Sequence, residues 1–216
     1  MRTFMMKSMK GSMMKSDFSN MNRRTMLAGL SASGTVLVAS PAIALTESEA
    51  RRLIDAAVAD INNVINSGKS ESAMYGDFER IFKRYADVPT IARSALGPPA
   101  RSASSAQLGA FTDAFTGYLA RKYGKRFREF IGGKIEVQSA RAVKTFQEVR
   151  AVAILRGQSP FSVSFMVSDR SGSDKFFDLL IEGISLLKSE RAEIGAMLDK
   201  RRGDIDAMVG DLKNAG

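Results

Sequence analysis

The chain has 216 residues and a formal net charge of +9, and it contains no histidine, cysteine or tryptophan. Without histidine and cysteine it has no imidazole base, no thiol nucleophile and no zinc site built from these residues, which excludes most routes to catalysis. The first 44 residues hold six basic residues and one acidic residue, so the remainder carries about +4. This excess is too small to indicate a nucleic-acid-binding domain.

Residues 1–44 have the pattern of a twin-arginine export signal. The pair Arg23-Arg24 precedes a weakly apolar stretch from Leu27 to Ile43. The stretch ends in Ala42-Ile43-Ala44, which has the small residues of a cleavage site. We expect export to the periplasm with cleavage after Ala44, and Met21 is a candidate start of translation. The alternative is a retained membrane anchor, for which the stretch is short and rather polar.

The remaining residues, 45–216, are enough for one domain with a substantial core. The first half of this domain has the apolar periodicity of helices. Thr46 and Glu49 have the spacing of a capping box, and Gly97-Pro98-Pro99 would stop a helix. We expect four helices here, over about 47–66, 74–85, 89–96 and 104–131.

After residue 133 the pattern changes to that of strands. Alternation at period two over 161–167 is typical of a half-buried antiparallel strand. We expect a strand that opens at 135–137 and further strands at about 149–155, 161–167 and 176–181, then helices at 189–198 and 203–212. This order predicts an α+β fold in which a curved antiparallel sheet carries helices on its concave face, with a hydrophobic pocket between the layers.

Large apolar side chains recur along these elements, and each aromatic ring can bury about 150–250 Å². A cavity lined by such groups would suit acyl chains, whereas the alternative is an ordinary packed core. The candidate pocket residues are Tyr75, Phe78, Phe82, Phe111, Phe115, Tyr118, Leu119, Val163, Phe165, Phe177 and Ile181.

Basic residues form a second candidate site, for an anionic headgroup or an acidic partner. Several of them lie on the polar side of the longest predicted helix, where a solvated helix face is the alternative. The candidates for docking are Arg93, Arg101, Arg121, Lys122 and Arg126.

Catalytic patterns are poor in the rest of the chain. Asp204 and Asp206 lie near a predicted helix start, where capping explains them better than metal binding. Gly132-Gly133 lacks the lysine and the spacing of a phosphate-binding loop. Acid–base chemistry by Asp87, Asp178 or Glu182 with a tyrosine would need a carboxylate of raised pKa facing a cavity. We therefore expect no enzyme, no catalytic residues, no metal and no cofactor.

Two segments resemble the MlaC family, also known as the toluene-tolerance family. The first runs from Arg84 through Asp87-Val88-Pro89 to Ala95-Leu96-Gly97, and the second from Lys175 to Leu186 with Ile181-Glu182-Gly183-Ile184-Ser185. The resemblance covers about residues 45–214. It implies a helix-wrapped sheet similar to the NTF2-like arrangement, around a pocket for phospholipid.

The resemblance also implies partners. A family member would carry phospholipid between an outer-membrane lipoprotein complex and an inner-membrane ABC transporter complex with an MCE-domain ring. It would need no reaction and no cofactor, would contact membrane surfaces only transiently, and would work most simply as a monomer. A carrier without catalysis is thus the leading hypothesis, and an interaction module with a solid interior is the second.

This chain departs from the family pattern at several positions. Ala100 and Asp174 stand where tryptophans are common, Phe177 replaces a tyrosine, and Ser189-Glu190 replaces Asn-Tyr. These departures leave the cargo open between a phospholipid and another apolar lipid such as a hopanoid.

The segment from Ile181 to Leu186 also has a structural interpretation. Gly183 would end a strand and allow a tight turn. Glu182 and Ser185 would then cap the following helix, and Asp178 would be a hydrogen-bonded carboxylate. Under this interpretation Ile181 or Ile184 remains available for lipid contact.

Overall fold

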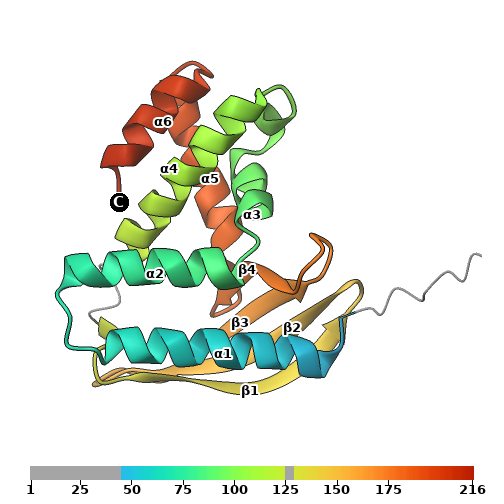
Figure 1. Cartoon of the computed structure of the whole chain (residues 1–216), viewed down its shortest axis with the longest axis vertical. Coiled ribbons are helices and arrows are strands. Elements are labelled where there is room, and N and C mark those ends of the chain that lie inside the picture. Colours follow the sequence, from blue (N-terminus) through green and yellow to red (C-terminus); the bar gives the residue numbers. More distant parts are fainter. Residues whose placement is uncertain (1–44, 125–128) are drawn as a thin grey trace, which may run out of the picture. The chain divides into compact units, whose positions relative to one another are not determined.

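The computed structural model describes residues 45–124 and 129–216. Helices and strands follow in the order expected of an α+β domain, and the predicted α+β class with an antiparallel sheet is confirmed (Figure 1). The helices are α1 (Glu47–Ile65), α2 (Glu71–Tyr85), α3 (Val88–Leu96), the 3-10 turn η1 (Pro98–Arg101), α4 (Ser105–Gly124), α5 (Leu186–Lys200) and α6 (Ile205–Asn214). The strands are β1 (Lys134–Val143), β2 (Phe146–Ile154), β3 (Phe161–Ser168), β4 (Lys175–Ile181) and β5 (Ile184–Ser185).

The five strands form one antiparallel sheet in the order β1-β2-β3-β4-β5. Register shifts interrupt the ladder between Val137 and Ser139 and between Met166 and Val167. Such bulges bend a strand and increase its twist. The second bulge lies beside the start of β4, so it changes the direction of the strand that lies nearest the helices α3 and α5.

Helix α1 lies along the sheet and protects the free edge of β1. Arg51 donates hydrogen bonds to the carbonyl oxygens of Val137 and Gln138, at 3.3 and 3.0 Å, where the first bulge occurs. Asn62 exchanges two hydrogen bonds with the backbone of Ile135, at 3.2 and 3.3 Å. An open strand edge can pair with a strand of another chain. The contacts from α1 occupy backbone groups of β1 and so oppose such pairing.

The buried apolar residues form three clusters. The helical core joins α3, α4, α5 and α6, and includes Phe111, Phe115, Ile194, Met208 and Leu212. The sheet core lies between α1 and the strands, and includes Ile54, Val149, Val163, Phe165 and Val167. A small third cluster, Ile65, Met74 and Phe78, joins α1 to α2.

Several local predictions are confirmed by the backbone hydrogen bonds. Thr46 and Glu49 form the capping box at the start of α1. Asp204 accepts a hydrogen bond from the Ala207 amide and so begins α6. Ser185 accepts one from the Lys188 amide and begins α5.

The predicted extent of the longest helix differs from the structure. It is expected to reach Ile131; α4 is described as far as Gly124, residues 125–128 lie outside the described residues, and Phe130 then lies in a 3-10 segment and Ile131 in a turn. The strand-like segment expected to open at 135–137 is the ten-residue β1, which pairs with β2 along its length. β1 is an edge strand with many exposed residues, so it lacks the apolar alternation that signals a strand.

Within the described residues, no helix has the length and apolar character needed to cross a bilayer. The same part of the chain holds no group of three or more acidic residues arranged to bind a metal ion. The predicted export signal lies outside the described residues.

Candidate functional site

The aromatic residues of α4 lie inside the helical core. Phe111 and Phe115 are completely buried and Tyr118 is 2% exposed. Their rings stack along the helix, with centroids 5.4 Å apart for the first pair and 6.1 Å for the second. Leu119 packs against the same core and is half-buried. These four predicted pocket residues therefore lie among α3, α5 and α6, away from the sheet core.

The other predicted pocket residues are divided among different places. Val163 and Phe165 belong to the sheet core, and Phe78 belongs to the third cluster. The ring of half-buried Tyr75 packs against Gly124 at the end of α4. These residues belong to different clusters in the structure, and α1 packs over strands β1 to β3.

Strand β4 differs from its neighbours because all seven of its residues are half-buried. Strands β2 and β3 instead hold several fully buried side chains. Leu179 lies opposite Phe165 and Ile181 opposite Val163, so both share the face that the sheet core occupies. This strand therefore carries incompletely covered apolar groups on its inner face.

Partly buried aromatic side chains continue this surface where the clusters meet. Phe176 packs against both the helical core and the sheet core, with ring centroids 6.0 Å from Phe82 and 5.7 Å from Phe165. Phe130 packs at 6.2 Å from Phe161. We call this set the β4 seam, and define it as Phe82, Phe130, Phe161, Phe176, Leu179 and Ile181.

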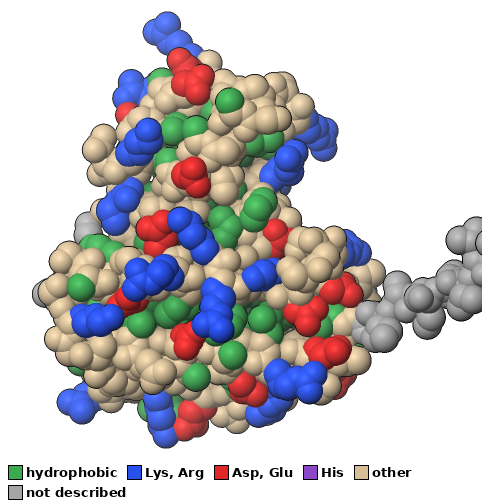
Figure 2. Space-filling view, in the orientation of Figure 1, with side chains coloured by type: hydrophobic (Ala, Val, Ile, Leu, Met, Phe, Trp, Pro, Cys, Tyr) green, Lys and Arg blue, Asp and Glu red, His purple; other side chains and the backbone are tan. Residues whose placement is uncertain are grey.

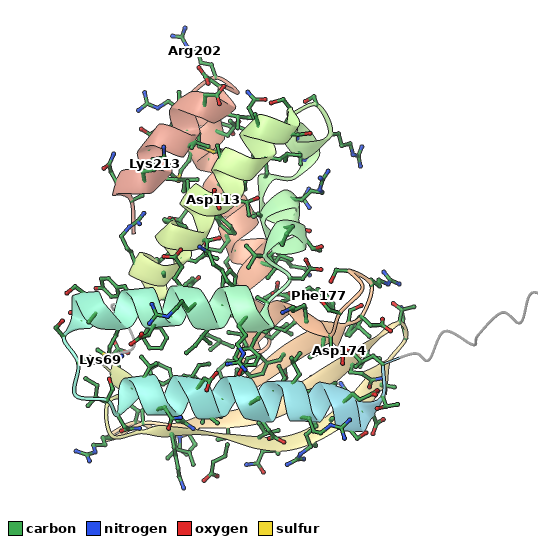
Figure 3. The ribbon with its side chains drawn as sticks, in the orientation of Figure 1. Lys69, Asp113, Asp174, Phe177, Arg202 and Lys213 are labelled. Carbon is green, nitrogen blue, oxygen red and sulfur yellow. The ribbon has the colours of Figure 1, made fainter. Side chains whose placement is uncertain are left out.

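The predicted pocket residue Phe177 lies on the other face of the sheet. Its ring packs edge-on against Phe146, with centroids 5.5 Å apart. Phe146 precedes Gln147, whose side chain reaches Leu45 on the α1 side, so Phe146 points away from α1. Phe177 and Asp174 mark the turn end of β4, and Lys69 marks the α1–α2 turn at the opposite end of the sheet (Figure 3).

Two surface hollows lie beside the start of α3. One of about 300 Å³ lies between α3 and α4, and Pro89, Arg93, Leu108, Gly109, Thr112 and Asp113 line it. The other, of about 280 Å³, is lined by Lys83, Ala86, Asp87, Val88, Pro89, Ser171, Ser173 and Lys175. Asp113, labelled on α4 in Figure 3, belongs to the first. Both volumes are at or below the lower end of the ~300–1,000 Å³ range of ligand pockets, so neither hollow suits a pair of acyl chains.

The predicted docking residues have different surroundings. Arg93 and Arg101 are exposed, and Arg93 lines the larger hollow. Arg121 donates to the backbone oxygens of Ala215 and Leu212, at 2.8 and 2.6 Å, and so closes the end of α6. Arg126 lies outside the described residues. On the face that carries α1, α2 and α4, Lys and Arg alternate with Asp and Glu (Figure 2).

Lys122 is held in a polar cluster between α4 and α5 that the sequence analysis did not identify. Its ammonium contacts Glu190 at 2.8 Å and also pairs with Glu193. Burial opposes the charged form of Lys122, but these carboxylates outweigh burial and raise its pKa. Burial, and then the hydrogen bond to Glu190, raises the pKa of Tyr123, so this hydroxyl stays protonated.

One signal for this cluster is present in the sequence. Glu190, Ile194 and Leu198 recur at spacings of four, and all three are buried on α5. A charged residue on the apolar stripe of a helix needs a buried partner. For the β4 seam, by contrast, no sequence pattern separates Phe176 and Phe130 from ordinary core residues.

The three carboxylates considered for catalysis have structural partners, and Asp87 accepts from the Thr90 amide at the start of α3. Asp178 accepts hydrogen bonds from Leu179, Ser185 and Leu187, at 2.8, 2.6 and 3.1 Å, and ties β4 to the start of α5. Glu182 lies at the β4–β5 turn, where it and Gly183 have positive φ, and it accepts from the Ser162 amide. Gly183 thus forms the predicted tight turn, whereas Glu182 anchors β3 rather than capping α5.

Comparison with known proteins agrees with this architecture. A phospholipid-binding protein from Ralstonia solanacearum, solved in complex with a phospholipid, has a similar fold, with a TM-score of 0.66 and 20% sequence identity. The match covers 76% of this chain and 95% of that protein. The sequence matches the MlaC protein family over residues 51–214. The chain therefore belongs to the MlaC family.

Proposed function

We propose that this protein is a phospholipid carrier that holds acyl chains along the β4 seam. The observation that carries the proposal is the incomplete burial of β4 and of the aromatic residues beside it, next to strands β2 and β3 that hold several fully buried side chains. Membership of the MlaC family and the fold shared with a phospholipid-binding protein support it.

The driving force is apolar burial. Each methylene group removed from water contributes about 0.8 kcal/mol, so a sixteen-carbon chain supplies on the order of 10 kcal/mol before ordering costs. For a tail to lie in the seam, Phe82 must separate from Phe176, which widens the space between α2 and β4. Their contact is edge-on and partly exposed, so its loss costs less than opening a fully buried core.

The carrier acts in the periplasm after removal of residues 1–44. There it receives and delivers phospholipid between an inner-membrane ABC transporter complex with an MCE-domain ring and an outer-membrane lipoprotein complex. It works as a monomer, without a chemical step and without a cofactor. The export signal in the sequence and the family membership support these assignments.

Lipid uptake tests the proposal directly. Native mass spectrometry of the protein from its own periplasm, and after incubation with phospholipid vesicles, should show one bound phospholipid. Replacing Ile181 by Glu should lower uptake on the order of tenfold or more, because a carboxylate would then face a hydrocarbon chain.

Ala196→Glu is the control, because Ala196 is exposed on α5 and lies outside the β4 seam. We expect it to leave uptake unchanged. Absence of lipid from the native protein, with none taken up from vesicles, would refute the carrier function. Extraction of a hopanoid in place of a phospholipid would correct the cargo.

A further inference from the structure

Leu45, the first described residue, is fixed to the sheet at its side chain and at its backbone. The side chain is 8% exposed and belongs to the sheet core. The amide nitrogen donates to Asp169 Oδ2 at 3.2 Å, and the carbonyl oxygen accepts from the side chain of Gln147 at 2.8 Å. Both partners are more than 100 residues away in sequence, so the tertiary fold holds this position.

The side chain of Gln147 has an acceptor that no described residue uses. The residue is 9% exposed, and its Nε2 group donates to the Leu45 carbonyl oxygen. Its Oε1 atom is buried and has no hydrogen-bond partner among the described residues. An unpaired buried acceptor is costly, which favours an additional N–H or O–H group beside it.

The charges around the Leu45 nitrogen favour a cation. Asp169 is half-buried and forms no ion pair within the described part of the chain. The positive end of the α1 dipole opposes a cation here, but Glu47 and Glu49 place two carboxylates in the first turn of that helix. Basic residues of the adjoining segments bind β1 or are exposed to solvent, namely Arg51, Arg52, Lys144 and Arg170.

Removal of residues 1–44 by a leader peptidase would change the chemistry of this nitrogen. Hydrolysis breaks the C–N bond between Ala44 and Leu45. The water oxygen joins Ala44 to form a carboxylate, and both water protons join the Leu45 nitrogen to form an ammonium. An α-amino group has an ordinary pKa of about 8, so it is charged at neutral pH, and a neighbouring carboxylate favours the charged form further.

We propose that Asp169 and Gln147 form a binding site for the N-terminal ammonium that processing creates at Leu45. Asp169 pairs with the new charge, and Gln147 Oε1 accepts one of the two new N–H groups. Asp169 also begins the turn before β4, because its carbonyl oxygen accepts from the Gly172 amide at 2.8 Å. Processing thus strengthens the junction of α1, β2 and the β3–β4 turn. This inference rests on the proposed removal of residues 1–44 and is independent of the lipid.

A thermodynamic cycle tests the site. Asp169→Asn keeps the shape of the side chain and removes its charge. It is made in a chain that begins at Leu45 and in the full 216-residue chain, and all four proteins are unfolded in urea at neutral pH. In the shorter chain the substitution should raise the equilibrium constant of unfolding about fivefold more than in the full chain, because hydrogen bonds between charged groups are the stronger ones.

The pH dependence of this excess separates the ammonium from a purely structural role of Asp169. The neighbouring carboxylate raises the pKa of the ammonium in the folded state. Its contribution to stability is therefore complete below the unfolded-state pKa of about 8 and is lost as the pH rises through the folded-state pKa. The fivefold excess should vanish at high pH, and an excess that persists there would contradict the assignment.

Two controls locate the effect. A chain that begins at Ala44 moves the ammonium by one residue, about 3.8 Å between Cα atoms, and should behave like the full chain. Asp55→Asn, in an exposed pair with Arg51 on α1, should have the same effect in every chain. An equal effect of Asp169→Asn in all three chains would overturn the site.

The position of processing is measured separately. N-terminal sequencing of the protein recovered from its own periplasm should give Leu45 as the first residue. Any other first residue would overturn this inference. The carrier function would then still be decided by the lipid-uptake experiment, so the two failures are distinguishable.

Discussion

The helical core and the β4 seam contain similar aromatic residues but differ in how completely they are covered. In the helical core Phe111 and Phe115 are fully buried and stack on each other. In the seam Phe82 and Phe176 meet edge-on and remain partly exposed. Rings that are close-packed on all sides stabilise the fold, whereas rings with an open side can exchange contacts with a ligand.

This difference changes the assignment of roles within the domain. The α4 aromatics, predicted as pocket wall, hold α3, α5 and α6 together. Strand β4 lies where the helical core meets the sheet core. It is held to α5 through Asp178 and to the end of α2 through a bridge between Ala86 and Phe176. A ligand in the β4 seam would therefore contact the helical core and the sheet core at once.

The largest expected effect is on stability in the helical core. Phe115→Ala should lower the free energy of unfolding by about 3–5 kcal/mol, because the site is fully buried and leaves a cavity. Leu179→Ala, at a half-buried site of the seam, should cost only about 1–2 kcal/mol. Urea unfolding of both variants measures the difference. Equal losses would mean that the seam is packed as tightly as the core.

A smaller effect is expected from two glycines of α4. An added Cβ at Gly124 would overlap the Tyr75 ring, so Gly124→Ala should cost about 1–3 kcal/mol. Gly109 has nothing within 4 Å of such a Cβ, so Gly109→Ala should stabilise the same helix by up to about 1 kcal/mol. Thermal unfolding checks both, and a stabilising Gly124→Ala would show that α2 does not pack against the end of α4.

The smallest effect concerns the outer face of the sheet. Burial opposes ionisation of Glu148, but hydrogen bonds from Arg150, Arg141 and Ser164 outweigh it and lower the pKa of this carboxyl. Because the folded-state pKa is the lower one, the stabilisation is present above the unfolded-state pKa and is lost as the pH falls through the folded-state pKa.

Glu148→Gln should therefore cost about 1 kcal/mol at neutral pH, and this difference from the wild-type protein should vanish in acid. Unfolding measured across the acidic range tests this. A difference that persists unchanged at low pH would show that the charge of Glu148 does not matter. Glu79→Gln at an exposed pair should change stability by less than about 0.5 kcal/mol.

Local signals in the sequence predicted much of the backbone. The caps at Thr46, Ser185 and Asp204 depend on one turn of chain, and each is found where the sequence indicates. The full length of β1 was not predictable, because many of its residues are exposed and show no apolar alternation. Its free edge is bound by Arg51 of α1, a contact that no local pattern indicates.

The candidate site was less predictable. Helical spacing identifies which residues of α4 are buried, but not whether a sheet or another helix covers them. The same limit applies to Lys122, which belongs to a basic stretch in sequence and to a carboxylate cluster in the fold. Both assignments depend on which elements meet, and that is a property of the whole domain.

Crosslinking with a phospholipid that carries a photoreactive group in its acyl chain tests the tail site most directly. With the lipid bound and the adduct mapped by peptide mass spectrometry, we expect adducts on β4, at Phe176 to Ile181, and at Phe82 of α2. Adducts confined to Arg93 and Leu108 in the hollow between α3 and α4 would contradict it.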